Sequence, residues 1–146
     1  MRRMDIEDFL RARIDDDEAT ARNVLSGYAP GRSASWSSPW SGGLDTGDTV
    51  TSIDNDGPIA HHVAAWDPAR VLAEAKTKRR LIDLASEANG LDIQVENEFG
   101  VGRRDEETDP YCGDEILREM ARPYAGHPDY NEAWRPRGCD ASGVKQ

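Results

Sequence analysis

The stretch DPARVLAEAKTKRRLIDLASEANG, residues 67 to 90, decides the fold because it shows both ends of a helix and one continuous apolar face. Asp67 can serve as the N-cap, and Pro68 suits the first helical position, where its missing N–H costs nothing. Gly90 after Asn89 is typical of a helix end. The apolar side chains recur at helical spacing of three and four residues and form one face: Val71, Leu72, Ala75, Ile82 and Ala85, with Leu81 and Leu84 on its flanks. We therefore predict a helix over residues 67–90 with one buried face.

Basic residues gather mostly on the other side of this helix: Lys76, Lys78, Arg79 and Arg80. Residues 67–90 carry five Lys or Arg and four Asp or Glu, whereas residues 91–115 carry two and nine. Separated charge of this kind steers the association of proteins. The basic run and the acidic residues Asp105, Glu106 and Glu107 therefore form a candidate interaction surface, unless the two neutralise one another within the chain.

The composition narrows the class of protein. The chain has 146 residues, 37% hydrophobic and 7% aromatic content, and a net charge of −10, which favours a modest core with irregular ends. An acidic chain is a poor ligand for nucleic acid. No apolar run approaches the roughly 20 residues that span a bilayer, and the start lacks the apolar part of a signal peptide. The chain has only two cysteines, Cys112 and Cys139, which fits a reducing compartment. We therefore expect a cytoplasmic protein.

A second helix is predicted over residues 5–25. Asp5 can cap it, and Asp8 stands where a capping box has its acceptor. Its apolar stripe consists of Ile6, Phe9, Leu10, Ile14, Ala21, Val24 and Leu25. We interpret the acidic run at 15–18 as a solvated helix face rather than a cation site.

Residues 26–47 are rich in Gly, Ser and Pro and are predicted to be irregular. They contain Trp36 and Trp40, and linkers gain nothing from burying large rings, so we expect at least one of these side chains to pin the segment to the domain.

A β-hairpin is predicted over residues 49–66, with strands at 49–54 and 58–66 around the turn sequence Asn55-Asp56-Gly57. His61 and His62 would then point to opposite sides of the sheet.

The remainder of the chain is predicted to close the core. Alternating apolar and polar residues indicate a short strand at 91–96. Residues 100–112 are predicted to form an acidic loop, and residues 114–122 a third helix. An aromatic turn follows, with Tyr124, Tyr130 and Trp134 lying over the edge of the core. Residues 136–146 are predicted to be a disordered tail.

No catalytic, nucleotide-binding or metal motif is present in the sequence. A zinc site could combine Cys112, His127 and one hairpin histidine, and Cys112 at a helix start could be a reactive thiolate. We favour the simpler interpretation of a small residue at a loop–helix junction, with no cofactor. If the protein is an enzyme or binds a ligand, its pocket is expected to be lined by Trp40, His62, His127, Tyr130 and Trp134.

Three stretches resemble an uncharacterised family of small acidic proteins from actinobacteria and their phages: DIEDFLRARIDDDEATAR, IAHHVAAWDPARVLAEAKTKRRLIDL and RPYAGHPDYNEAWRP. The most specific parts are residues 67–84 and 124–134. The family is a domain of unknown function, so the resemblance implies a source and not an activity. Its members often carry further cysteines between the central helix and the last one, where this chain keeps only Cys112.

The sequence as a whole predicts one α+β domain over residues 1–135. Two longer helices pack antiparallel, a β-hairpin lies between them in the chain, and a short C-terminal helix carries an aromatic turn. The preferred function is that of an interaction or accessory protein that binds another protein. The alternative is a small enzyme or ligand-binding protein with a pocket between hairpin and helices; no membrane or direct nucleic-acid contact is expected.

Overall fold

A computed structural model of the chain describes residues 4–26, 31–54, 57–100, 102 and 109–136. Contacts divide the chain into two compact units. Unit 1 comprises residues 1–12 and 79–146, and unit 2 comprises residues 13–78. Helices α1 (Ile6–Leu25) and α3 (Pro68–Phe99) contribute to both units. The extent of one domain over residues 1–135 stays a prediction, and the tail after residue 136 lies outside the described residues.

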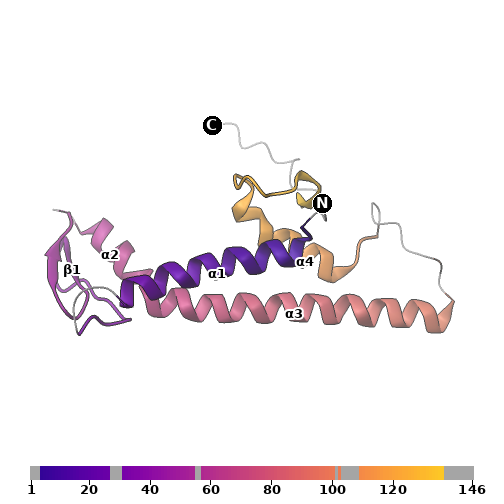
Figure 1. Cartoon of the computed structure of the whole chain (residues 1–146), viewed down its shortest axis with the longest axis horizontal. Helices are drawn as coiled ribbons and strands as arrows, with labels where there is room; N and C mark the ends of the chain where they lie inside the picture. The colour runs from indigo at the N-terminus through magenta and orange to yellow at the C-terminus, as the bar shows by residue number, and fades with distance from the viewer. Residues whose placement is uncertain (1–3, 27–30, 55–56, 101, 103–108, 137–146) are drawn as a thin grey trace. The chain divides into compact units, whose positions relative to one another are not determined.

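The predicted antiparallel pairing of the two long helices is confirmed, and Figure 1 shows α1 lying along α3. In unit 1, Ser86 Oγ on α3 donates a hydrogen bond to Glu7 on α1 (2.5 Å), and Arg11 forms an ion pair with Asp83 (2.9 Å). Residue numbers rise on one helix as they fall on the other, so the chains run in opposite directions. Asp5 caps α1 by accepting a hydrogen bond from the Asp8 amide (2.8 Å).

The core of unit 1 is formed by α1, α3 and α4 (Cys112–Ala121), and α4 begins two residues before its predicted start. Gly113 of α4 lies so close to α3 that a side chain there would overlap the carbonyl oxygen of Ala85 and the side chain of Asn89. Asn89 in turn donates to the Asp114 carboxylate (2.8 Å). The buried apolar side chains of this unit are Phe9, Leu10, Ile82, Ala85, Leu117 and Ala121.

The predicted aromatic turn is confirmed as a cluster around Phe9. Two short 3-10 helices, η1 (Arg122–Tyr124) and η2 (Glu132–Trp134), follow α4. They place the rings of Tyr124, His127, Tyr130 and Trp134 at 6.1, 5.7, 6.1 and 5.0 Å from the Phe9 ring. The Phe9 side chain is fully buried, so the turn covers one edge of the unit 1 core.

The prediction of a helix end at Gly90 and a strand at 91–96 is wrong, because α3 continues to Phe99. Gly90 is not among the glycines with positive φ, so it lies in the helix rather than ending it. A single interior glycine costs a helix only about 1 kcal/mol. Helical contacts follow it: the Gln94 side chain donates to Glu98 one turn later (3.0 Å).

The hairpin between the long helices is confirmed, and β2 (Val50–Ser52) lies within the first predicted strand at 49–54, but its partner strand is not the predicted one. In unit 2, β1 (Gly43–Asp45) pairs antiparallel with β2. Thus β1 lies inside the segment at 26–47 that was expected to be irregular. The strand predicted at 58–66 is instead the helix α2 (Pro58–Ala65).

The start of α2 explains this difference. Pro58 occupies the first turn, and the Asp54 carboxylate accepts hydrogen bonds from the amides of Ile59 (3.1 Å) and Ala60 (3.3 Å). Residues that are typical of a turn therefore start a helix. Gly57 precedes it with a φ of 89°, whereas residues 55 and 56 lie outside the described part of the chain. Consequently His61 and His62 are both exposed on a helix rather than on opposite faces of a sheet.

Asp67 caps α3 as predicted, and it also ties down the preceding segment. Its carboxylate accepts hydrogen bonds from the amide of Arg70 (2.8 Å) and from the amide of Trp36 (3.1 Å). The Trp36 indole donates to the Ser33 carbonyl (2.9 Å). Trp36 is thus the tryptophan that pins residues 31–42 within unit 2, while Trp40 is 52% exposed.

Candidate functional site

The C-terminal half of α3 exposes a row of large apolar side chains in unit 1. Leu91, Val95 and Phe99 are 65%, 51% and 75% exposed, and Leu81 and Leu84 are 40% and 42% exposed. With about 100° of rotation per residue, these residues and Ala88 fall within one sector of roughly 80°. We refer to this set as the α3 stripe: Leu81, Leu84, Ala88, Leu91, Val95 and Phe99. Contiguous exposed apolar patches of more than a few hundred Å² are uncommon on monomeric soluble proteins.

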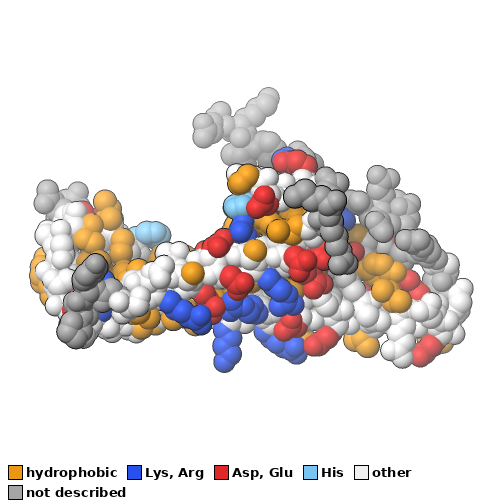
Figure 2. Space-filling view, in the orientation of Figure 1, with side chains coloured by type: hydrophobic (Ala, Val, Ile, Leu, Met, Phe, Trp, Pro, Cys, Tyr) orange, Lys and Arg blue, Asp and Glu red, His pale blue; other side chains and the backbone are white. Residues whose placement is uncertain are grey.

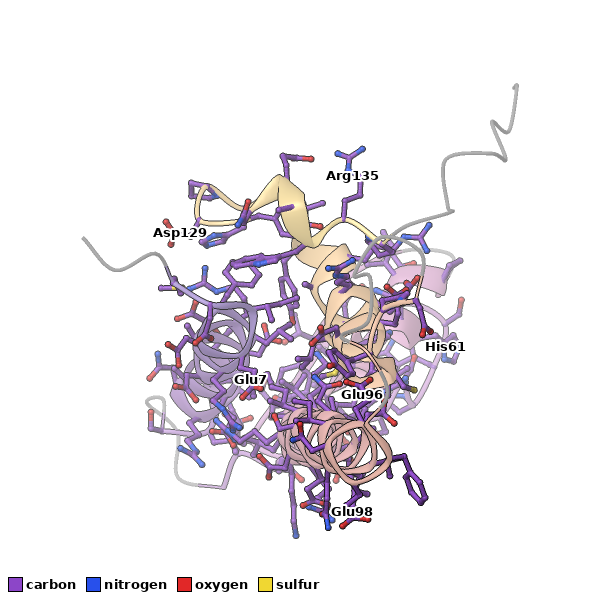
Figure 3. The ribbon with its side chains drawn as sticks, turned by 90° about the vertical axis from the view of Figure 1, so that its right-hand side faces the viewer. Glu7, His61, Glu96, Glu98, Asp129 and Arg135 are labelled. Atoms are coloured by element: carbon purple, nitrogen blue, oxygen red, sulfur yellow. The ribbon has the colours of Figure 1, made fainter. Side chains whose placement is uncertain are left out.

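The flank of the stripe is polar and carries charges of opposite sign at its two ends. Arg80 pairs with Glu87 (3.0 Å), both side chains being 59% exposed. In Figure 3, which looks along α3, Glu98 points away from α1 and α4. Glu96 lies on the other side and accepts a hydrogen bond from the Tyr111 hydroxyl (2.9 Å). The two glutamates show that one side of the α3 end packs within unit 1 while the Glu98 side faces outward.

The predicted basic surface is partly paired within the chain. Lys78 pairs with Asp17 (3.6 Å) within unit 2, and Arg80 pairs with Glu87 as above. Arg79 also has a partner, and Lys76 is exposed. Figure 2 shows Lys and Arg side chains gathered over the middle of α3 with acidic side chains among them. The acidic residues proposed to complement them, Asp105, Glu106 and Glu107, lie outside the described residues, so this surface stays a prediction.

Unit 2 contains a cavity of about 330 Å³. Its apolar wall is formed by Ala21, Val24, Trp36, Trp66, Pro68 and Val71, and its polar lining by Asp17, Thr20, Glu74 and Lys78. The charged groups are neutralised locally, since Glu74 accepts a hydrogen bond from Arg70 (2.9 Å). The Arg70 guanidinium also lies 4.1 Å from the centroid of the Trp66 ring. The cavity therefore suits a small and mainly apolar group.

The five residues predicted to line a pocket are distributed over both units. In unit 2, Trp40 packs against Gly43, and the His62 ring is tilted by 47° to the Trp66 ring with 6.3 Å between their centroids. Neither Trp40 nor His62 lines the cavity. In unit 1, His127, Tyr130 and Trp134 belong to the cluster on Phe9. The prediction missed both cavity tryptophans, Trp36 and Trp66. The strand expected over 58–66 hides the position of Trp66 at the junction between two helices.

A shallow apolar depression of about 470 Å³ lies on α4 in unit 1 and is lined by Cys112, Glu115, Ile116, Glu119 and Met120. Cys112 is free and exposed there. Within the ranges that the structure describes, no three His, Cys, Asp or Glu side chains gather as metal ligands. The features of the described residues that could hold a partner are therefore the exposed stripe, the cavity and this depression.

The family of unknown function DUF6221 matches residues 3–136. The chain belongs to the DUF6221 family. No curated protein and no solved structure matches it. The DUF6221 match spans both units, including the whole of α3 and of the cavity lining. None of the helices in the described residues combines the length and apolar character needed to cross a membrane.

Proposed function

We propose that this DUF6221 protein is an interaction factor that binds protein partners through the α3 stripe. The observation that carries the proposal is the exposure of Leu91, Val95 and Phe99 at the end of a regular helix. In this proposal it acts in the cytoplasm as an accessory factor of an actinobacterium or its phage, a source implied by the resemblance of its sequence.

Physical chemistry favours a partner on this face. Each Å² of apolar surface removed from water contributes roughly 25 cal/mol, and the exposed Leu91 and Phe99 leave that contribution unused within the chain. Their exposure does nothing for the stability of unit 1. A partner helix or groove that covers Leu91 and Phe99 would gain the free energy of burying them. Charges beside the stripe, such as Arg80 and Glu98, would set the orientation and the rate of association.

Site-specific photo-cross-linking tests this function. A photoreactive amino acid is placed at Leu91 in the full chain, and at Asn97 as a matched control on the same helix but off the stripe. Protein adducts that form in host cells from position 91 and not from position 97 support the proposal. Equal adducts from both positions, or none from position 91, would overturn it. Circular dichroism of both variants checks that α3 is retained.

A second candidate function is the binding of a small apolar ligand in the unit 2 cavity. The observation that favours it is the presence of Trp36 and Trp66 in the wall of a cavity of about 330 Å³, a volume within the range of ligand pockets. Binding of the apolar dye anilinonaphthalene sulfonate to the full chain tests it. Trp66→Ala should abolish binding, whereas Trp40→Ala, an equal truncation outside the cavity lining, should not. No binding by the native chain, or equal loss in both variants, argues against a ligand.

A further inference from the structure

The geometry of the α3 stripe points to a second copy of this chain as its partner, and we propose that two copies pair antiparallel along it. This inference rests on the proposed interaction function and names the occupant of that same surface. It is carried by three properties of α3: the spacing of the stripe, the size of its central residues and the order of charges beside it.

The spacing is that of a two-helix coiled coil. From Leu81 the stripe continues through residues 84, 88, 91 and 95, so its steps alternate between three and four. These are the a and d positions of two successive heptads. In a coiled coil, each a or d side chain inserts into a hole formed by four residues of the facing helix. A row of a and d side chains, here called the seam, is therefore best complemented by a second row of the same kind. A second copy of the chain carries such a row on its own α3.

The central residues favour the antiparallel direction. In a parallel pair, Ala88 would face Ala88 and Leu91 would face Leu91, which alternates a thin layer with a thick one. In an antiparallel pair centred between them, Ala88 of each copy packs against Leu91 of the other. Leu84 then meets Val95, so successive layers have similar volume. Even filling of this kind matches the close packing that protein interiors require.

The charges beside the stripe favour the same direction. Arg80 precedes the first residue of the stripe, and Glu98 occupies the a/d-type position that follows Val95, with Phe99 beside it. Parallel pairing sets each charge against its own copy. The antiparallel register that places Ala88 against Leu91 places Glu98 against Leu81 of the second copy, with the neighbouring Arg80 close to the Glu98 carboxylate. The present partners, Glu87 for Arg80 and Gln94 for Glu98, lie on the exposed helix surface. Such surface contacts are weak and can be exchanged or shared.

The size of the seam sets the expected affinity. Residues 81 to 99 of a helix extend over about 27 Å. One helix pair of this length covers less than the roughly 800 Å² per partner of a standard interface. We therefore expect a reversible dimer with a dissociation constant in the micromolar range rather than an obligate one.

Sedimentation of the full chain across the micromolar range tests the pairing. The native chain should change from monomer to dimer as its concentration rises. Leu91→Glu should remain monomeric throughout, because it buries a carboxylate in the seam, and Asn97→Glu, with the same added charge off the stripe, should dimerise like the native chain. A native chain that stays monomeric over this range would overturn the proposal, as would dimerisation that Leu91→Glu leaves unchanged.

The direction of pairing is tested by charge exchange and by cross-linking. Arg80→Glu should weaken the dimer several-fold, and adding Glu98→Arg should restore it; a parallel pair would not be weakened by the first change. In a chain with both native cysteines replaced by serine, Leu84→Cys mixed with Val95→Cys should form a mixed disulfide. Faster formation of the Leu84→Cys homodimer would overturn the antiparallel order.

The photo-cross-linking experiment separates this inference from the proposed function. Adducts from position 91 that contain a second copy of the chain support both. Adducts that contain only other proteins, together with a monomeric chain, leave the interaction function standing and reject the second copy. A monomeric chain with no adduct from position 91 rejects both.

Discussion

Asp48 forms an ion pair with Arg32 that closes the hairpin of unit 2. Its carboxylate contacts Arg32 Nε at 3.2 Å and Nη2 at 3.1 Å and accepts a hydrogen bond from the Thr46 hydroxyl (2.7 Å). The Asp48 side chain is only 4% exposed. Arg32 also donates to the Val24 carbonyl in the last turn of α1 (3.2 Å). One guanidinium therefore joins the end of α1 to the turn between β1 and β2.

This pair predicts a loss of stability in acid. The hydrogen bonds from Arg32 and Thr46 lower the pKa of Asp48 below its ordinary value. The unfolded chain therefore binds a proton at a higher pH than the folded chain, and the contribution of Asp48 is complete above about pH 4 and is lost as the pH falls through the lower, folded pKa. Asp48→Asn should lower the melting temperature at pH 7, and the difference from the native chain should shrink as the pH approaches 3.

Thermal unfolding followed by circular dichroism between pH 7 and pH 3 measures this effect. Asp16→Asn is the control, because the Asp16 side chain is 70% exposed in the middle of α1 and its surface ion pair with Arg13 contributes little, so its loss should change the melting temperature little. A difference between Asp48→Asn and the native chain that stays constant over this range would contradict the assigned role of the ion pair.

Phe9 is predicted to be the anchor of the aromatic turn. Its side chain is fully buried and contacts the four rings described above. Phe9→Ala should reduce the free energy of unfolding by about 3–5 kcal/mol, since it leaves a cavity in the core of unit 1. The near-ultraviolet circular dichroism of the tyrosine and tryptophan side chains should weaken with it.

Phe99→Ala provides the matched control, because the same truncation is made at a side chain that is 75% exposed. Its effect on monomer stability should stay within about 0.5 kcal/mol. Urea unfolding at low protein concentration compares the two variants, and equal losses would show that Phe9 is no more important to the core than an exposed residue.

Gly113 is predicted to set the approach of α4 to α3. A methyl group there would overlap backbone at Ala85 as well as the Asn89 side chain, and backbone yields less readily than a flexible side chain. Gly113→Ala should therefore destabilise unit 1 by about 1–3 kcal/mol. Gly126→Ala, at a position with open space and no positive φ, should change stability little; urea titrations that rank the two variants in the opposite order would reject this contact.

The sequence predicts the long helices and their pairing because their signals are local. Asp5 and Asp67 cap helices exactly where a short polar side chain precedes a periodic apolar stretch. The predicted strand at 58–66 is wrong because its local signal is ambiguous: the Asp, Gly and Pro residues around its start suit either a turn or the start of a helix. Asp54 selects the helix by capping α2, a contact across several residues that a turn motif does not reveal.

The candidate surfaces depend on contacts that a sequence pattern does not contain. Leu81 and Leu84 lie beside the buried face of α3, and periodicity does not distinguish an apolar side chain in the core from one left uncovered. Residues 91–95 alternate in a way that equally suits a strand, which conceals the stripe. The cavity likewise brings together Trp36 and Trp66, which are 30 positions apart in the sequence. Helix and strand periodicity relates only residues that are close in sequence, so it does not predict this contact.

Gly90→Ala provides a test of whether α3 continues beyond its apparent stop signal. A glycine that ends a helix in the left-handed conformation is destabilised by alanine. Inside a helix the same substitution stabilises by about 0.5–1 kcal/mol, and a Cβ at Gly90 meets open space. We expect Gly90→Ala to raise both the helical circular dichroism signal and the urea midpoint. Gly57→Ala is the opposing control, because Gly57 has a φ of 89° and should lose stability. A lower urea midpoint for Gly90→Ala would place the end of α3 at Gly90 and remove residues 91–99 from the stripe.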